Sequence, residues 1–386
     1  MESVLFNMND VMLMFAIFEC LLLGVILAFI ANMPRTKRLL LSLFLLAMAA
    51  DFTDTLIYWS EPIKAQIISG SVYPFFVLKV SGFVAAPALY LYVRSVLFSD
   101  FTIKSRCVLH FLPAAAFLLF AGIFVITHDQ EFFVRSKHEY GLLFDDGMFQ
   151  AYLIAKNLIY IGYGAGSFRL LANYRKHLEQ GYSSIENIDP LWLRLLVTGF
   201  LCIWLSYFGS YLSHRILDSL FLADFLGLVG NYLNVFFITT LVVYSLVKSQ
   251  HFQGVEEMDS SSFEKASSDQ QLAIASSLEK AMIEAKMYLD PELTLEQLAH
   301  SLGLSRKAVS STINRQFGKN FFEFVNEFRI NVAMSLLSDA SAGNSILDIM
   351  EASGFNSKST FNRCFKSATQ MTPSQYRKKS TRNNPY

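Results

Sequence analysis

Long apolar runs dominate the first two thirds of the chain. In the last third, apolar residues recur three and four positions apart between polar ones. Seven runs have about 20 apolar residues, a length that crosses the ~30 Å hydrocarbon core of a membrane as a helix. They lie at residues 10–31, 39–59, 73–98, 107–127, 149–171, 191–213 and 221–247. The pattern predicts an all-α protein with an N-terminal bundle of seven transmembrane helices. The 386-residue chain is 53% hydrophobic and 17% charged, below the roughly 25% charged residues of a soluble domain, which supports this assignment.

Basic residues in the short loops predict the orientation, because cytoplasmic loops carry an excess of Lys and Arg. The loops after the first, third and fifth runs are the basic ones: Arg35, Lys37 and Arg38, then Lys104 and Arg106, then Arg175 and Lys176. The alternate loops carry fewer basic residues or balance them with acidic ones. We therefore expect a multi-pass protein of the bacterial inner membrane, with residue 1 outside and everything from residue 248 onward in the cytoplasm.

Polar side chains inside the predicted spans are the first candidate functional residues, since intramembrane charges usually face a bundle interior or a water-filled cavity. They are Glu19, Asp51, Asp54, Lys79, Lys156, Asp224, Asn231 and Asn234. One interpretation is interhelical ion pairs, such as Lys79 with Asp51 or Asp54. The other is an outward-open pocket for a small-molecule or membrane signal. The two interpretations are compatible, and the sequence does not separate them.

A polar segment separates the membrane domain, residues 1–248, from the C-terminal domain, residues 272–386. Residues 249–271 are rich in Ser, Gln and acidic side chains and show no apolar period, which predicts a flexible linker. We expect the seventh span and this linker to be the only covalent connection between the two domains.

An apolar stripe follows the linker at a spacing of three and four, as on one face of a helix. Its members are Ala275, Leu278, Met282, Ala285 and Leu289. Packing onto the following domain explains the stripe, and a homodimer seam through residues 275–289 is the alternative.

The C-terminal domain contains the same helical pattern twice. In the first copy, near residues 294–317, Thr294 begins a capping box, Gly303 ends the short helix, and a second capped helix follows. The second copy, near residues 345–368, repeats the apolar spacing, with Gly354 in the place of Gly303. A short helix, a tight glycine turn and a second helix form a helix-turn-helix. The sequence thus predicts two tandem helix-turn-helix units joined by a long helix.

The second copy also carries a long and specific set of residues: Gly354-Phe355, Phe361-Asn362-Arg363, Phe365-Lys366, Thr372-Pro373-Ser374 and Tyr376-Arg377. With these residues, the region 273–380 resembles the DNA-binding domain of the AraC/XylS transcriptional regulators. One position departs from the family pattern, since Met350 stands where Ala is usual. The resemblance covers little more than a quarter of the chain and implies sequence-specific binding of double-stranded DNA.

In a helix-turn-helix, the N-terminal residues of the second helix reach base edges in the major groove. The resemblance and the outward positions assign this role to Arg306, Lys307, Ser310 and Ser311 in the first unit and to Lys358, Ser359, Asn362 and Arg363 in the second. Contacts to phosphates, which add affinity without sequence information, are expected from Arg315, Lys319 and Lys366.

Together these features predict a membrane-embedded one-component transcriptional regulator, in which a signal sensed by the membrane domain controls DNA binding. The sequence shows no catalytic constellation, metal-ligand spacing or cofactor motif, so we expect neither an enzyme nor a bound metal or cofactor. The expected partners are double-stranded DNA, the lipid bilayer and an unidentified signal. The alternative is a transporter or membrane enzyme whose state the attached DNA-binding domain reports, and substrate accumulation in vesicles would distinguish it.

Overall fold

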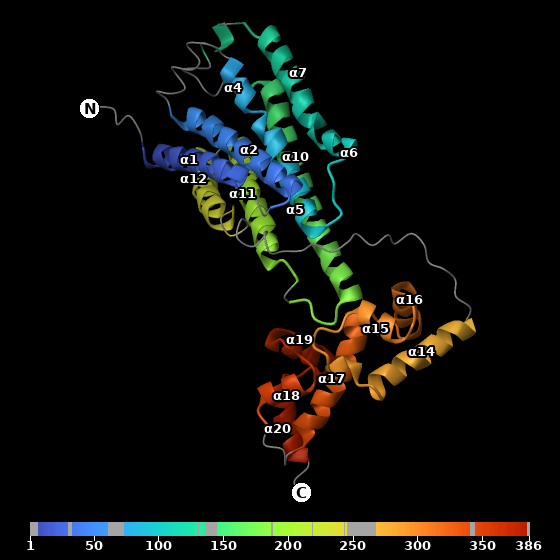
Figure 1. Cartoon of the computed structure of the whole chain (residues 1–386). Helices are drawn as coiled ribbons and strands as arrows, with labels where there is room; N and C mark the ends of the chain where they lie inside the picture. The colour runs from blue at the N-terminus through green and yellow to red at the C-terminus, as the bar shows by residue number, and fades with distance from the viewer. Residues whose placement is uncertain are drawn as a thin grey trace. The chain divides into compact units, whose positions relative to one another are not determined.

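The computed structural model of the chain describes residues 7–29, 33–60, 73–129, 131–133, 135, 145–186, 188–217, 219–242, 244, 268–339 and 344–383. The named elements among these residues are helices, and β-structure is limited to isolated bridge residues such as Tyr182 with Thr294, so the predicted all-α class is confirmed. The chain divides into two compact units (Figure 1). The first comprises Met1–Leu171 and Pro190–Glu257, and the second comprises Ala172–Asp189 and Met258–Tyr386.

This division shows that the chain passes between the two units at three places, after residues 171, 189 and 257. The expectation of a single covalent connection through the seventh span is therefore wrong. The expectation fails because the segment 172–189, which was predicted as a cytoplasmic loop, packs as part of the C-terminal unit. Helix α10 (Gly147–Gly181) is continuous over 35 residues and contributes to both units.

The first unit is a helix bundle. Its other elements are α1 (Met8–Phe29), α2 (Arg35–Trp59), α4 (Tyr73–Leu78), α5 (Ser81–Leu97), α6 (Ser105–Val108), η1 (Leu109–Phe111), α7 (Leu112–Thr127), α11 (Leu191–Ile216), α12 (Leu220–Phe237) and the π-helical turn η2 (Ile238–Val242). Helix α2 packs against both α1 and α5, and α11 packs against α12, which in turn contacts α1.

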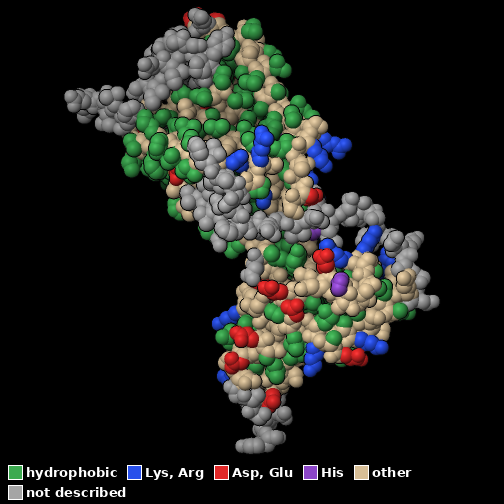
Figure 2. All heavy atoms as spheres, in the orientation of Figure 1, with side chains coloured by type: hydrophobic (Ala, Val, Ile, Leu, Met, Phe, Trp, Pro, Cys, Tyr) green, Lys and Arg blue, Asp and Glu red, His purple; other side chains and the backbone are tan. Residues whose placement is uncertain are grey.

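Six helical segments among the described residues are long and apolar enough to cross a membrane. They coincide with six of the seven predicted spans, and the exception is residues 149–171 of α10. Lys156 and Asn157, together with glycines and tyrosines, lower the hydropathy of this segment. Large apolar side chains such as Phe18 and Phe221 are exposed, and hydrophobic atoms cover much of the face of this unit drawn in Figure 2. Such an apolar exterior is typical of a surface that contacts lipid.

The second unit contains α14 (Ser268–Ile283), η3 (Met287–Leu289), α15 (Leu295–Ser301), α16 (Arg306–Gln316), α17 (Phe321–Ser338), α18 (Ile346–Ala352), α19 (Lys358–Thr369) and α20 (Pro373–Asn383). Helix α17 contributes to two hydrophobic cores. Its first half packs with α14, α15 and α16 through Phe321, Phe324 and Val325. Its second half packs with α18, α19 and α20 through Ile330, Ala333 and Leu337. One helix thus holds the two helix pairs of this unit together.

Two members of the apolar stripe after the predicted linker pack within the same chain, whereas Ala285 and Leu289 are exposed. Leu278 and Met282 are fully buried in the first core. These are the side chains that a homodimer seam through residues 275–289 would need, so the structure favours the packing interpretation. The helix is also shifted relative to the prediction, because α14 already includes residues 268–271 and ends at Ile283. The rest of the predicted linker, residues 249–267, lies outside the described residues.

Candidate functional site

The helix pair α15–α16 begins with the predicted capping box. Thr294 Oγ1 accepts a hydrogen bond from Gln297 N–H (3.2 Å), and Gln297 Oε1 accepts one from Thr294 N–H (2.7 Å). At the turn, Gly303 has a φ of +65°, a conformation that glycine adopts without strain. Leu304 N–H then donates to Ala299 O at 2.9 Å and closes the turn.

The helix pair α18–α19 repeats this geometry. Ser345 and Asp348 form its capping box, and Gly354 has a φ of +87° at the turn. Phe355 N–H donates to Met350 O at 3.1 Å, which is the equivalent of the bond that closes the first turn. Met350 therefore leaves the turn closed although the family usually has Ala at this position, and its side chain packs into the second core.

Each second helix buries one side and presents the other to solvent. The buried positions are Val309, Thr312 and Ile313 in α16 and Thr360, Phe361 and Phe365 in α19. Most of the predicted DNA contacts are exposed: Arg306, Lys307, Arg315, Lys358, Ser359, Arg363 and Lys366. The others are half-buried: Ser310, Ser311, Lys319 and Asn362. Both helices thus combine an apolar inner side with a polar, mainly basic outer side.

Contacts made by Arg363 and Lys319 affect the roles expected of these cations. The Arg363 guanidinium lies over the ring of Phe322, 5.5 Å from its centroid, an arrangement that orients the long side chain. Lys319 pairs with the Glu327 carboxylate on α17. Lys319 would have to leave this partner to contact a phosphate, so Arg315, which is exposed, is the stronger candidate for that role.

The sequence interpretation missed Asn314, which lies on the same outer side of α16. Asn314 is exposed, and it follows Lys307 by two helical turns and Ser311 by one. Its Nδ2 donates to Ser310 O at 2.9 Å. An asparagine on a reading helix can pair with adenine. The helical spacing in the sequence is sufficient to identify this residue.

The two turn glycines differ in the space around them, which predicts different costs of substitution. A Cβ on Gly354 would lie 2.6 Å from the carbonyl oxygen of Tyr288, whereas a Cβ on Gly303 would meet nothing within 4 Å. G303A is expected to cost about 1–2 kcal/mol of unfolding free energy, because Ala must adopt a left-handed conformation. G354A adds a backbone overlap and is expected to cost about 3 kcal/mol or more.

Amide exchange of α15 to α19 in the full-length chain measures both costs. Equal losses of protection in the two variants would contradict the steric role of the Tyr288 carbonyl.

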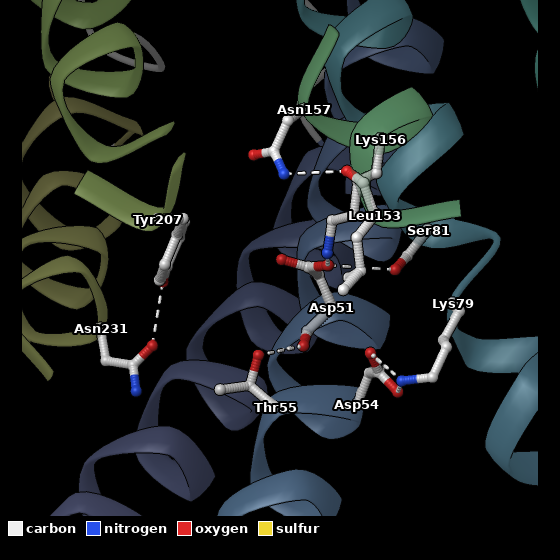
Figure 3. A network of polar contacts seen from close by, with 10 residues as sticks. All are labelled: Asp51, Asp54, Thr55, Lys79, Ser81, Leu153, Lys156, Asn157, Tyr207 and Asn231. Atoms are coloured by element: carbon white, nitrogen blue, oxygen red, sulfur yellow. Dashed lines mark hydrogen bonds and ion pairs between the residues drawn. The ribbon is translucent and has the colours of Figure 1, made fainter. Parts of the chain in front are cut away.

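The first unit contains paired charges in its interior (Figure 3). Lys79 lies at the break between α4 and α5, and its Nζ is 2.8 Å and 3.0 Å from the carboxylate oxygens of Asp54 on α2. Lys156 Nζ on α10 lies 3.0 Å from Asp51 Oδ1, which also accepts a hydrogen bond from Ser81 Oγ (3.4 Å). Two lysines and two aspartates thus neutralise one another, and the suggested Lys79–Asp54 ion pair is present.

A separate series of polar contacts links α1, α11 and α12. Tyr207 Oη donates to Asn231 Oδ1 at 2.9 Å, and Asn231 Nδ2 donates to Asn9 Oδ1 at 3.3 Å. Asn234 is also buried on α12, and its Oδ1 has no hydrogen-bond partner among the described residues. Tyr207 and Asn9 extend the set of polar residues that the sequence suggested.

The structure does not gather all the predicted membrane residues into one site. Glu19 Oε2 accepts a hydrogen bond from Thr239 Oγ1 at 2.7 Å. Asp224 is exposed, so its prediction as part of an interior polar cluster is wrong: it lies near the N-terminal end of α12, two helical turns before the buried Asn231 on the same side of the helix. In the described part of the chain, no group of three or more His, Cys, Asp or Glu side chains could hold a metal ion.

Comparisons with known proteins concern the C-terminal unit. A family described as a helix-turn-helix domain matches residues 298–379. An uncharacterized HTH-type transcriptional regulator of Staphylococcus aureus (strain COL) is 33% identical over 92 residues, which are 24% of this chain and 12% of that protein. The uncharacterized HTH-type transcriptional regulator YtdP of Bacillus subtilis (strain 168) is 31% identical over 88 residues, 23% of this chain and 11% of that protein.

The matched region is thus a small part of these relatives, since the chain spans only 12% and 11% of their lengths. No solved structure matches the chain. The family match covers both turns described above and the helix between them. The C-terminal region of this chain is an AraC-type helix-turn-helix domain.

Proposed function

We propose that the chain is a membrane-embedded one-component transcriptional regulator that binds specific DNA sequences. The observation that carries the proposal is the presence, in one chain, of an AraC-type helix-turn-helix domain and, among the residues that the structure describes, of six helices able to span a membrane. Helix α10 would be the seventh span. The DNA-binding domain must share a compartment with DNA, which puts it in the cytoplasm and, with seven spans, residue 1 outside.

The helix pairs α15–α16 and α18–α19 would act as two tandem helix-turn-helix units. Their second helices would enter successive major grooves, whose centres lie about 34 Å apart. The outward residues of α16 and α19 would read base edges, and Arg315 and Lys366 would contact phosphates. The connecting helix α17 supports this arrangement, because it packs into the cores of both pairs.

The signal would act on the interior of the membrane unit. Asp51, Asp54, Lys79 and Lys156 join α2, the α4–α5 break and α10 through two ion pairs. A charged ligand, or a change in the surrounding membrane, that favours a different pairing would shift these helices relative to one another. The sensing role rests on this network and not on the whole set of polar residues suggested by the sequence.

Selection of DNA from a random-sequence pool by the full-length chain in lipid nanodiscs tests the proposal. The wild type is expected to enrich one motif with two halves. R363A is expected to lose about 1–3 kcal/mol at one base position and to relax specificity there. R315A is expected to weaken binding to all sequences. It is also expected to reduce, by about one, the slope of the logarithm of the affinity against the logarithm of the salt concentration.

Equal, sequence-independent losses from R363A and R315A would show that Arg363 contacts only phosphate. A wild-type chain that enriches no sequence would contradict the proposed function as a whole.

A further inference from the structure

The segment between α10 and α11 is built into the DNA-binding unit through Ser183. This residue is 0% exposed. Its N–H donates to Leu293 O at 3.1 Å, and its carbonyl oxygen accepts from Asn326 Nδ2 at 3.0 Å and from Arg329 Nη1 at 3.3 Å. Its Oγ accepts a further bond from Arg329 Nη2 at 3.0 Å. Both the backbone and the side chain of this serine are therefore used for docking.

Arg329 on α17 is the centre of the docking site and is only 1% exposed. It also donates from Nε to Tyr288 O and from Nη2 to Asp290 O, both at 2.7 Å. Its guanidinium lies 5.6 Å from the centre of the Phe355 ring in the second turn. These oxygens are neutral, and burial lowers the pKa of Arg329 to about 10. A buried cation held by neutral acceptors depends on its backbone acceptors, among them the carbonyl oxygen of Ser183.

The neighbours of Ser183 reach both helix pairs. Tyr182 forms the isolated β-bridge with Thr294, the residue that caps α15. Ser184 Oγ donates to Asn356 Oδ1 at 3.0 Å, and Asn356 lies in the turn that precedes α19. Ile185 is buried as well. One short segment thus contacts the start of the first pair, the connecting helix and the turn of the second pair.

Helix α10 connects this segment to the charged network of the membrane unit. Its 35 residues correspond to about 52 Å of helix, whereas about 20 residues suffice to cross the hydrocarbon core. The helix carries Lys156 of the ion pair with Asp51, and its last residue, Gly181, is two positions before Ser183. An unbroken helix transmits a shift or rotation along its axis, which a polar linker does poorly.

We propose that residues 182–185 are a docking segment through which the membrane unit controls the DNA-binding domain. While it is docked, the segment holds the two helix-turn-helix units in the arrangement that reads two half-sites, and its withdrawal lowers the affinity for such DNA. The inference rests on the proposed DNA-binding function. Its physical basis is preorganisation: two modules held at the correct separation bind paired sites more tightly than two modules that must first be ordered.

The substitution S183L tests docking, because a leucine cannot fit where a serine is fully buried. S183A is the matched control, since it keeps the backbone bonds to Leu293, Asn326 and Arg329 and removes only the Oγ contact. In the full-length chain in nanodiscs, the Ser183 amide is expected to exchange slowly in the wild type and in S183A and rapidly in S183L. Rapid exchange in the wild type would overturn the proposal.

DNA binding provides the functional readout, with the fragment that the wild type selects from a random-sequence pool as the probe. S183L is expected to bind the intact fragment about tenfold more weakly than the wild type does. Its affinity for a fragment that contains only one half-site is expected to equal that of the wild type. Equal affinity of S183L and wild type for the intact fragment, or tighter binding by S183L, would overturn the docking proposal alone. A wild-type chain that selects no fragment would instead overturn both this inference and the proposed function.

Discussion

Replacing Leu278 and Met282 by lysine is expected to unfold the C-terminal unit. Both side chains are 0% exposed and pack against α15, α16 and α17 in the first core. Each substitution buries an unpaired charge and is expected to cost about 4 kcal/mol or more. Domains are usually stabilised by about 5–15 kcal/mol in total, so the double variant should not remain folded. Loss of amide protection throughout α16 and α17 of the full-length chain measures this outcome.

The same helix supplies the control. Leu272 is 56% exposed and Ile283 is 64% exposed, so L272K and I283K are expected to change stability by no more than about 0.5 kcal/mol. The homodimer alternative makes a different prediction for L278K/M282K, namely a folded unit that has lost only self-association. Protected amides in α16 and α17 of that variant would therefore show that the stripe is an interface between copies of the chain.

Breaking the ion pair between Asp54 and Lys79 is expected to destabilise the first unit strongly. D54N removes the Asp54 carboxylate from the buried Lys79 ammonium, and K79M removes the ammonium from the buried Asp54 carboxylate. Removal of one partner of a buried pair costs about 3–5 kcal/mol. Thermal unfolding of the full-length chain in detergent is expected to show both losses.

The double variant D54N/K79M is expected to be more stable than either single variant, because both charges of the pair are removed together. The exposed pair of Glu131 and Arg135 is the control, with side chains 69% and 63% exposed. E131Q is expected to cost less than about 1 kcal/mol. Additive losses in the D54N/K79M double variant would show that the two groups do not depend on each other in the first unit.

Local sequence signals predicted the C-terminal unit well. The Thr294 capping box, the glycine turns at Gly303 and Gly354 and the buried face of each second helix all follow from residue types at fixed spacing. Such features depend on neighbours within one or two helical turns, so the sequence contains the information directly. The Lys79–Asp54 pair could also be predicted from the sequence, because a charge inside an apolar run requires a partner.

Features that depend on distant contacts could not be predicted in the same way. Ser183 lies in a polar loop, and nothing in its neighbourhood indicates that Arg329, far along the chain, encloses it. The burial of Leu278 was compatible with two interpretations, since an apolar stripe has the same spacing whether it faces its own domain or a second copy. The exposure of Asp224 depends on how far neighbouring helices cover α12 along its length, since Asn231 on the same side of the helix is buried, and the sequence does not fix that coverage.

Mapping the DNA bound by the full-length chain in intact cells tests the central claim most directly, namely that a membrane-held chain reads specific DNA. Cross-linked DNA recovered with the membrane fraction is expected to fall into a limited set of sites that share a motif with two halves. K307A/R363A, which removes one outer cation from each reading helix, is expected to lose these sites while remaining in the membrane fraction. The account would be contradicted if the wild type bound no sites that K307A/R363A fails to bind. It would also be contradicted if sites were recovered only with a soluble fragment of the chain.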